Sequence, residues 1–97
     1  MKTRNIINSN NEDTSPHPSE PFAVAQHIIT RAGWEYYLEE EDSYGLSFGY
    51  VMGFANEWGM VDMTELKPYI VSKATGSTLD EIMPPEGYYW EDEKETA

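Results

Sequence analysis

The stretch SYGLSFGYVMGFANEWG, residues 43–59, decides the fold that we expect. Large apolar side chains recur in it every four residues: Leu46, Tyr50, Phe54 and Trp58, with Val51 and Met52 beside them. Residues that are four apart share one face of a helix, so we predict a helix that closes at Gly59.

Three glycines follow the same four-residue spacing in this stretch: Gly45, Gly49 and Gly53. On a helix they form one stripe, along which a neighbouring backbone can approach closely. We interpret the stripe as tight helix packing inside the domain, and a homodimer seam is the alternative.

Two more helices are expected, one on each side. The first covers residues 22–33, where Phe22, Ala25, Ile29 and Ala32 recur at steps of three and four after the cap-like Ser19-Glu20-Pro21. The other starts at Asp62 or Thr64 and runs through Leu66, Tyr69, Ile70 and Ala74. The aromatic segment 34–38 between them is expected to be extended.

The expected fold class is therefore mainly α (α+β): one small domain of about three helices, with a short strand or an aromatic clasp at residues 88–90. We place the folded domain at residues 21–90. Residues 1–20 are polar and proline-containing, which is typical of a disordered tail, and residues 91–97 are charged and expected to fray.

Composition excludes several classes of protein. The 97 residues include 18 acidic and 6 basic side chains, a formal net charge of −12, and no cysteine. A disulfide framework, a cysteine-ligated zinc site and a thiol nucleophile are thereby excluded. No apolar run approaches the ~20 residues of a membrane helix, and the start lacks a signal peptide's apolar stretch. We expect a cytoplasmic protein, in the host cytoplasm if a phage or plasmid encodes it.

No pattern for catalysis or metal binding is visible. His17 and His27 have no second histidine at ligand spacing, and residues 39–42 lack the alternating ligands and central glycine of a calcium loop. The glycine stripe is not a phosphate loop, since it lacks the G-x-G-x-x-G spacing and a lysine. We predict no metal, no cofactor and no catalytic residue, and a protein that is not an enzyme.

Acidic residues dominate the middle of the chain. Between Arg31 and Lys67 there are eight acids and no base: Glu35, Glu39, Glu40, Glu41, Asp42, Glu57, Asp62 and Glu65. From residue 21 onward the chain has 15 acids, as many charges as about 25 Å of duplex DNA. That length is close to the ~30 Å diameter of a domain of this size. Nucleic acid and anionic membranes repel such a polyanion, so the expected partner is a basic protein.

Residues 66–79, LKPYIVSKATGSTL, suggest a family. Leu66, Tyr69, Ile70, Ala74, Gly76 and Leu79 fall in register on a pattern close to L-x-x-Y-I-x-x-x-A-x-G-x-x-L. In this the segment resembles the C-terminal region of the ArdA antirestriction proteins. Upstream, Trp58-Gly59-Met60-Val61 is similar to that family's entry into the same helix, and Gly87-Tyr88-Tyr89-Trp90 is similar to its Gly-aromatic ending. The family proteins are longer, multi-domain dimers, and this chain supplies one such domain.

The resemblance implies an inhibitor from a phage or other mobile element that mimics DNA and occupies the DNA-binding groove of type I restriction-modification enzymes. The eight acids of the middle region are then the predicted mimic surface. One alternative is an adaptor or regulator that binds a host or phage protein through aromatic anchors such as Trp34, Tyr36 and Trp90. Another is an anti-CRISPR or other nuclease inhibitor, which would use its negative charge in the same way against a different target.

Overall fold

The computed structural model describes residues 3–8 and 22–91, and within these ranges the chain is mostly β. A three-stranded antiparallel sheet has the order β2-β1-β8, from Phe22–Val24, Arg4–Asn8 and Tyr88–Trp90. A five-stranded antiparallel sheet has the order β6-β5-β4-β3-β7, from Asn56–Asp62, Leu46–Met52, Glu35–Leu38, Gln26–Thr30 and Ile70–Thr75. The mainly helical fold that we expected is therefore wrong.

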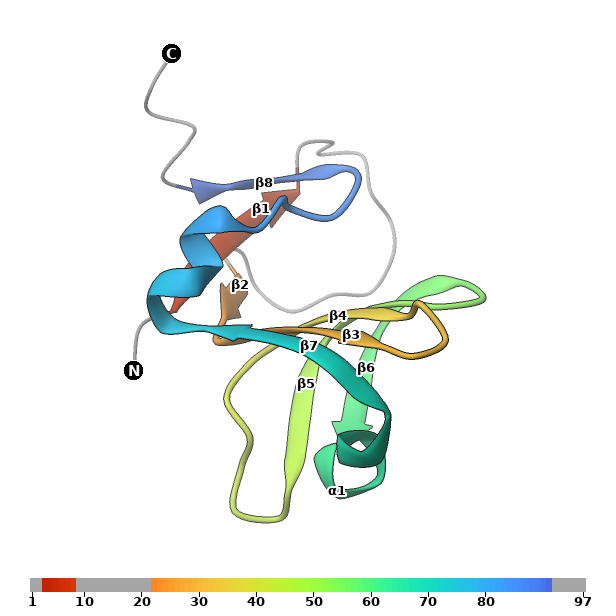
Figure 1. The fold of residues 1–97 in the computed structure, drawn as a ribbon. Coiled ribbons are helices and arrows are strands. Elements are labelled where there is room, and N and C mark those ends of the chain that lie inside the picture. The colour runs from red at the N-terminus through yellow and green to blue at the C-terminus, as the bar shows by residue number, and fades with distance from the viewer. Residues whose placement is uncertain (1–2, 9–21, 92–97) are drawn as a thin grey trace.

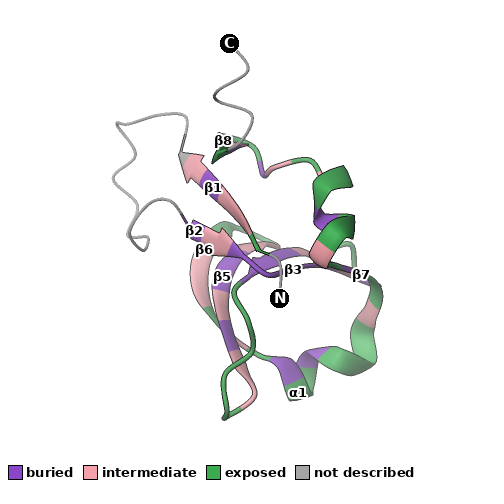
Figure 2. Ribbon diagram, turned by 90° about the vertical axis from the view of Figure 1, so that its left-hand side faces the viewer, coloured by how far each residue is buried: buried purple, intermediate pink, exposed green. Residues whose placement is uncertain are grey.

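Both faces of the five-stranded sheet are covered (Figure 1). On one face, the three-stranded sheet and the 3-10 helix η2 (Gly76–Glu81) enclose a core around Tyr37, Leu79 and Trp90. On the other face, the short helix α1 (Met63–Leu66) encloses a second core with Ile28 and Leu38. The 3-10 helix η1 (Lys67–Tyr69) then leads into β7. Buried residues run along the strands and onto α1, while residues 39–44 and most of η2 are exposed (Figure 2).

The stretch 43–59 forms the hairpin of β5 and β6, not a helix. Four-residue spacing is also a multiple of the two-residue period of a strand, so Tyr50 and Trp58 share one face in either structure. The predicted stripe of glycines on a helix is therefore wrong: Gly45 precedes β5, Gly49 lies within it and Gly53 follows it. A side chain at Gly49 would overlap the neighbouring strand, because an ideal Cβ there lies 2.1 Å from the carbonyl oxygen of Tyr37.

The other two predicted helices also form mostly strands in the structure. Residues 22–30 form β2 and β3, which are separated by Ala25, and residues 31–33 belong to the turn into β4. Ala25 donates its backbone N–H to the Leu38 carbonyl, so one nearly continuous segment serves both sheets. The third helix stops at Leu66, and Ile70–Thr75 continue as β7 beside β3. Asp62 caps α1 through bonds from the backbone N–H groups of Thr64 and Glu65, so of the two starts that the sequence left open, the structure has Asp62.

The ends of the chain differ in part from the prediction. Arg4–Asn8 of the supposed tail form β1, which pairs with β2 and β8 and buries Ile6. The rest of that tail and residues 92–97 lie outside the described residues. Segment 34–38 does hold a strand, and Tyr88–Trp90 form the predicted short strand. Within the described ranges, no helix has the length and apolar character needed to cross a membrane.

Candidate functional site

Six of the eight predicted acids gather at one end of the five-stranded sheet. We call this the acidic end: the β4–β5 connection, residues 39–45, and the β6–α1 junction, residues 62–65. The two segments are joined, since the Met63 N–H donates to the Gly45 carbonyl at 2.8 Å. The six side chains are all exposed: Glu39, Glu40, Glu41, Asp42, Asp62 and Glu65.

Two of these acids also shape the backbone. Asp42 accepts hydrogen bonds from the backbone N–H groups of Tyr44 and Leu46, at 2.8 and 3.0 Å, which fixes the turn into β5. Asp62 caps α1 in the same way. The described bonds to both reach only Oδ1, so these exposed carboxylates retain capacity to meet an outside donor.

The other two predicted acids lie elsewhere. Register places Glu35 opposite Met52 and Glu57 opposite Val51, toward the far ends of β4 and β5. Strand β5 has seven residues, so roughly 20 Å of strand separates these positions from the acidic end. The eight acids therefore do not form one continuous surface.

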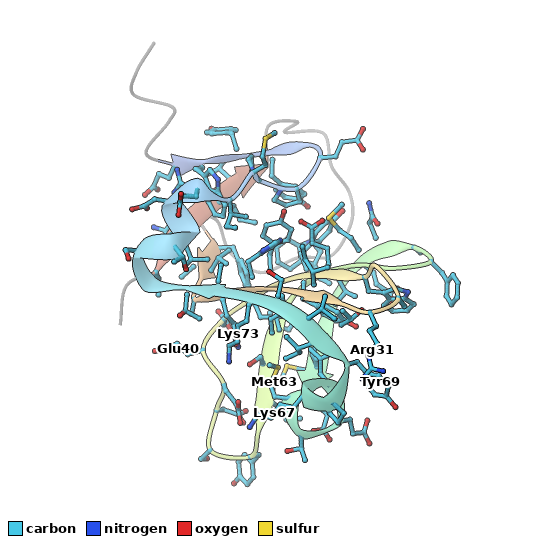
Figure 3. The ribbon with its side chains drawn as sticks, viewed as in Figure 1. Arg31, Glu40, Met63, Lys67, Tyr69 and Lys73 are labelled. Carbon is cyan, nitrogen blue, oxygen red and sulfur yellow. The ribbon has the colours of Figure 1, made fainter. Side chains whose placement is uncertain are left out.

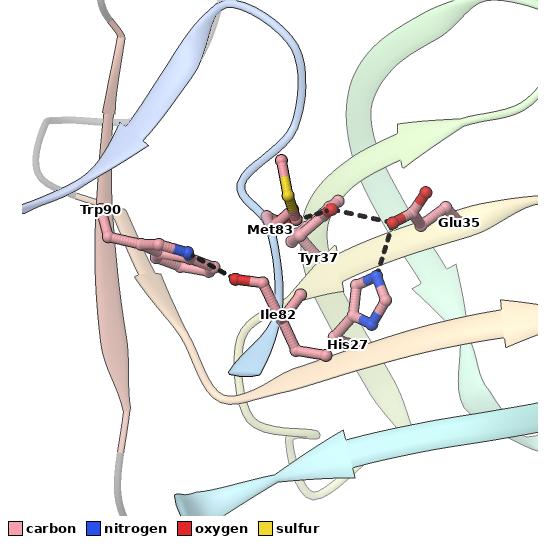
Figure 4. Close-up of polar contacts among 6 residues, drawn as sticks. All are labelled: His27, Glu35, Tyr37, Ile82, Met83 and Trp90. Atoms are coloured by element: carbon pink, nitrogen blue, oxygen red, sulfur yellow. Dashed lines mark hydrogen bonds and ion pairs between the residues drawn. The ribbon is translucent and has the colours of Figure 1, made fainter. Parts of the chain in front are cut away.

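Glu35 instead belongs to a polar cluster inside the sheet face (Figure 4). His27 Nε2 and the Tyr37 hydroxyl lie 2.7 and 2.8 Å from its Oε1, and the same hydroxyl lies 2.8 Å from the Met83 carbonyl oxygen. Burial raises the pKa of Tyr37 far above its usual range, and the hydrogen bond and negative charge of Glu35 add to this shift. Tyr37 therefore stays a neutral donor that ties the segment before β8 to the sheet.

The opposite end of the sheet carries an apolar groove. We call it the aromatic end: the β3–β4 turn, residues 31–34, the β5–β6 turn, residues 53–55, and η1. A groove of about 310 Å³ there is lined mainly by Trp34, Tyr36, Leu66 and Tyr69. Phe54 is 98% exposed and meets the Trp34 ring edge-on, with centroids 5.3 Å apart. Arg31 and Tyr69 lie on this side of the molecule, away from Glu40 (Figure 3).

Two of the three predicted anchors are buried, Trp90 and Tyr36, which is 8% exposed. Trp90 is fully buried, its Nε1 donates to the Ile82 carbonyl at 2.8 Å, and the Arg4 guanidinium lies 4.4 Å from its ring centroid. Trp34 and Tyr36, in contrast, both line the groove. Phe54 and Tyr69 join them there, and the sequence pattern missed these two because it assigned both to helices.

A polar cleft of about 320 Å³ adjoins the acidic end. It lies between the β4–β5 connection and β7, and its walls include Gln26, Glu40, Glu41 and Lys73. Figure 3 shows Glu40 and Lys73 near each other on one side of the molecule. Gln26 carries no motif signal in the sequence; only the pairing of β3 with β7 places it in this cleft. Among the described residues, no group of three or more His, Asp or Glu side chains is placed to hold a metal ion.

No known protein family, curated protein sequence or solved structure matches this chain.

Proposed function

We propose that this chain is a non-enzymatic inhibitor of the DNA-mimic type, acting in the host cytoplasm. The acidic end would enter the basic DNA-binding groove of a nucleic-acid enzyme and exclude DNA from it. The observation that carries the proposal is the run of four consecutive exposed carboxylates at residues 39–42, with two more across the β6–α1 junction.

The spacing of these charges supports mimicry. The Glu39 and Asp42 N–H groups bond at 2.8 Å to the carbonyl oxygens of Phe48 and Leu46, so the backbone of this segment runs along β5. An extended chain advances about 3.3 Å per residue. One strand of B-DNA carries a phosphate every ~3.4 Å of axis. Along residues 39–42 the charge per length of backbone therefore matches that of a single DNA strand, with successive carboxylates on alternate sides of the segment. Asp62 and Glu65 supply two more charges beside it.

The charge of the whole protein supports the same partner. A net charge of −12 attracts a cationic groove, speeds the encounter and repels nucleic acid itself. The resemblance of residues 66–79 to antirestriction proteins makes type I restriction-modification enzymes the first targets to test. The six motif positions lie on α1, η1, β7 and η2 and not on one helix, so the resemblance supports the choice of target and not a common fold.

The test is competition for DNA. Titrated into a complex of labelled duplex with a type I restriction-modification enzyme, the protein should displace the duplex at low salt. The half-inhibitory concentration should rise steeply between ~50 and ~200 mM salt, as it does for ligands held by many ionic contacts. Other nucleases, including RNA-guided ones, extend the panel to the related alternative. Failure to displace DNA from any enzyme of the panel at low salt would falsify the proposal.

The aromatic end favours a second candidate function, an adaptor that binds a protein partner through aromatic anchors. Trp34, Tyr36 and Tyr69 line an apolar groove, and the almost fully exposed Phe54 extends it. Tryptophan and tyrosine are the common anchors of protein interfaces. Binding of a partner from host lysate that persists in ~500 mM salt would favour this function, since charge pairing is screened at that ionic strength.

A further inference from the structure

The polar cleft beside the acidic end contains an acceptor with no described donor. Gln26 is only 6% exposed, and its Nε2 donates to the Glu39 carbonyl at 3.1 Å and to Ser47 Oγ at 3.0 Å. A backbone carbonyl can only accept, so these contacts fix which end of the amide is nitrogen. Within the described residues no hydrogen bond reaches Oε1, on a residue that lines the cleft.

The surroundings of this oxygen favour a cation. Glu40 and Glu41 add two carboxylates to the cleft wall and Lys73 adds one positive charge, which leaves a local net charge of −1. Because Gln26 is held by two hydrogen bonds, its oxygen is fixed before any ligand arrives. A ligand with one positive charge and several donors would satisfy the amide oxygen and the carboxylates together.

We propose that this cleft receives one arginine side chain from the basic groove of the partner protein. The inference rests on the proposed function and names the group that the acidic end recognises. A guanidinium presents five donors in a planar fork, so it can bond to Gln26 Oε1 and to a carboxylate simultaneously. A lysine ammonium is a more strongly hydrated point charge, and Lys73 would repel it at short range. A cleft of about 320 Å³ is large enough for one such side chain.

The experiment uses N-acetyl-arginine amide as the probe and the side-chain amide NMR signal of Gln26 as the readout. We expect saturable shifts with a Kd on the order of 1 mM, the range for a ligand of this size. The citrulline analogue has the same shape without the charge and should produce no saturable shift. Glu40→Gln should weaken binding about tenfold. Glu57→Gln removes the same charge far from the cleft and should leave the Kd within twofold.

A second pair of variants tests whether binding of the arginine probe can be tightened. Lys73→Met should tighten binding of the arginine probe about threefold, because it removes the like charge from the cleft wall, whereas Lys67→Met on η1 should not. Circular dichroism of each variant checks that the fold persists.

The outcomes separate this inference from the proposed function. Equal binding of the citrulline probe, or equal losses from Glu40→Gln and Glu57→Gln, overturns the arginine site. A protein that displaces DNA from its target but binds no arginine probe overturns the site and leaves the inhibitor function standing. A protein that binds the probe but displaces DNA from no enzyme supports the site and overturns the function alone.

Discussion

Where β4 runs into β5, four consecutive exposed carboxylates precede the exposed Tyr44, whereas at the other end of the sheet aromatic rings surround an apolar groove, with Arg31 beside them. The six carboxylates of the acidic end lie in solvent, while Met63 between them is buried in the second core. The aromatic end continues the second core, since Tyr36 and Leu66 belong to that core and Trp34 packs against it. The two surfaces thus differ in their ties to the fold: apart from Asp42 and Asp62, which hold backbone N–H groups, the carboxylates of the first can be altered with little effect on stability, whereas most of the second cannot.

Strand β5 connects these two ends, so a substitution that displaces β5 should affect both of them and have the largest effect. At Gly49 a Cβ would lie 2.1 Å from the Tyr37 carbonyl oxygen and 2.7 Å from Leu38 Cα. Gly49→Ala therefore has to push β5 away from β4, and we expect a loss of about 3 kcal/mol in the free energy of unfolding. The Tm measured by circular dichroism should fall by about 15 °C. Both surfaces should lose their binding together.

Gly59 is the matched control, because it pairs with Gly49 on the adjacent strand but has nothing within 4 Å of its ideal Cβ. Gly59→Ala should change the free energy of unfolding by no more than about 0.5 kcal/mol. Equal effects of the two substitutions would contradict the close approach of β4 and β5.

Neutralising the acidic end tests whether inhibition can be lost while the fold persists. The triple variant Glu39→Gln, Glu40→Gln, Glu41→Gln removes exposed charges that do not contribute to either core. In the DNA-competition assay at low salt we expect the half-inhibitory concentration to rise on the order of a hundredfold, with the Tm unchanged or slightly higher. A large fall in Tm would mean that these carboxylates are structural.

Three exposed acids outside the acidic end provide a control with the same change in net charge: Glu57, Glu81 and Glu86, each changed to Gln. This variant should shift the half-inhibitory concentration by less than about fivefold, because only the long-range field is reduced. If both triple variants lose inhibition equally, net charge decides binding and the arrangement at residues 39–42 has no special role.

The sequence indicated this fold poorly for a physical reason. A sheet that is covered on both faces has central strands without alternation, and β4 has three buried residues in succession, at 36–38. Such runs resemble helix faces, and the four-residue spacing of 43–59 fits either period. The signal against a helix was the glycines themselves, since each costs ~1 kcal/mol in a helix interior. Three within nine residues favour a hairpin with tight strand contacts.

Local chemistry was easier to predict than pairing. Asp62 caps α1 as its sequence context indicates, and the acid run is exposed as its charge requires. What depends on strand pairing was missed: Gln26 reaches the polar cleft because β3 lies between β4 and β7, and Glu35 reaches His27 because β3 pairs with β4. No spacing within a single segment encodes such neighbours.

The polar cluster of His27, Glu35 and Tyr37 lies on the inner face of the sheet, between the two ends, and a substitution there tests that face. Tyr37→Phe removes the hydroxyl that bonds to Glu35 Oε1 and to the Met83 carbonyl, and we expect a loss of about 2 kcal/mol at pH 7 in urea unfolding. Because the pKa of folded Tyr37 is raised, its contribution is fully present below about pH 10 and declines at higher pH. The difference between wild type and variant should shrink by about 1.4 kcal/mol at pH 11. Tyr44→Phe, at an exposed position, is the control and should change the free energy of unfolding at pH 7 by no more than about 0.5 kcal/mol.

The smallest effect on stability is expected at Phe54, the most exposed of the large hydrophobic side chains at the aromatic end. It is 98% exposed and its only described ring partner is Trp34, so Phe54→Ser should change the free energy of unfolding by less than about 0.5 kcal/mol. If the aromatic end binds a partner, the same variant should weaken that binding about tenfold, since an exposed ring beside a groove is a typical anchor. Inhibition by the acidic end should not change. A variant that loses inhibition and keeps its stability would instead mean that the two ends contact one target together.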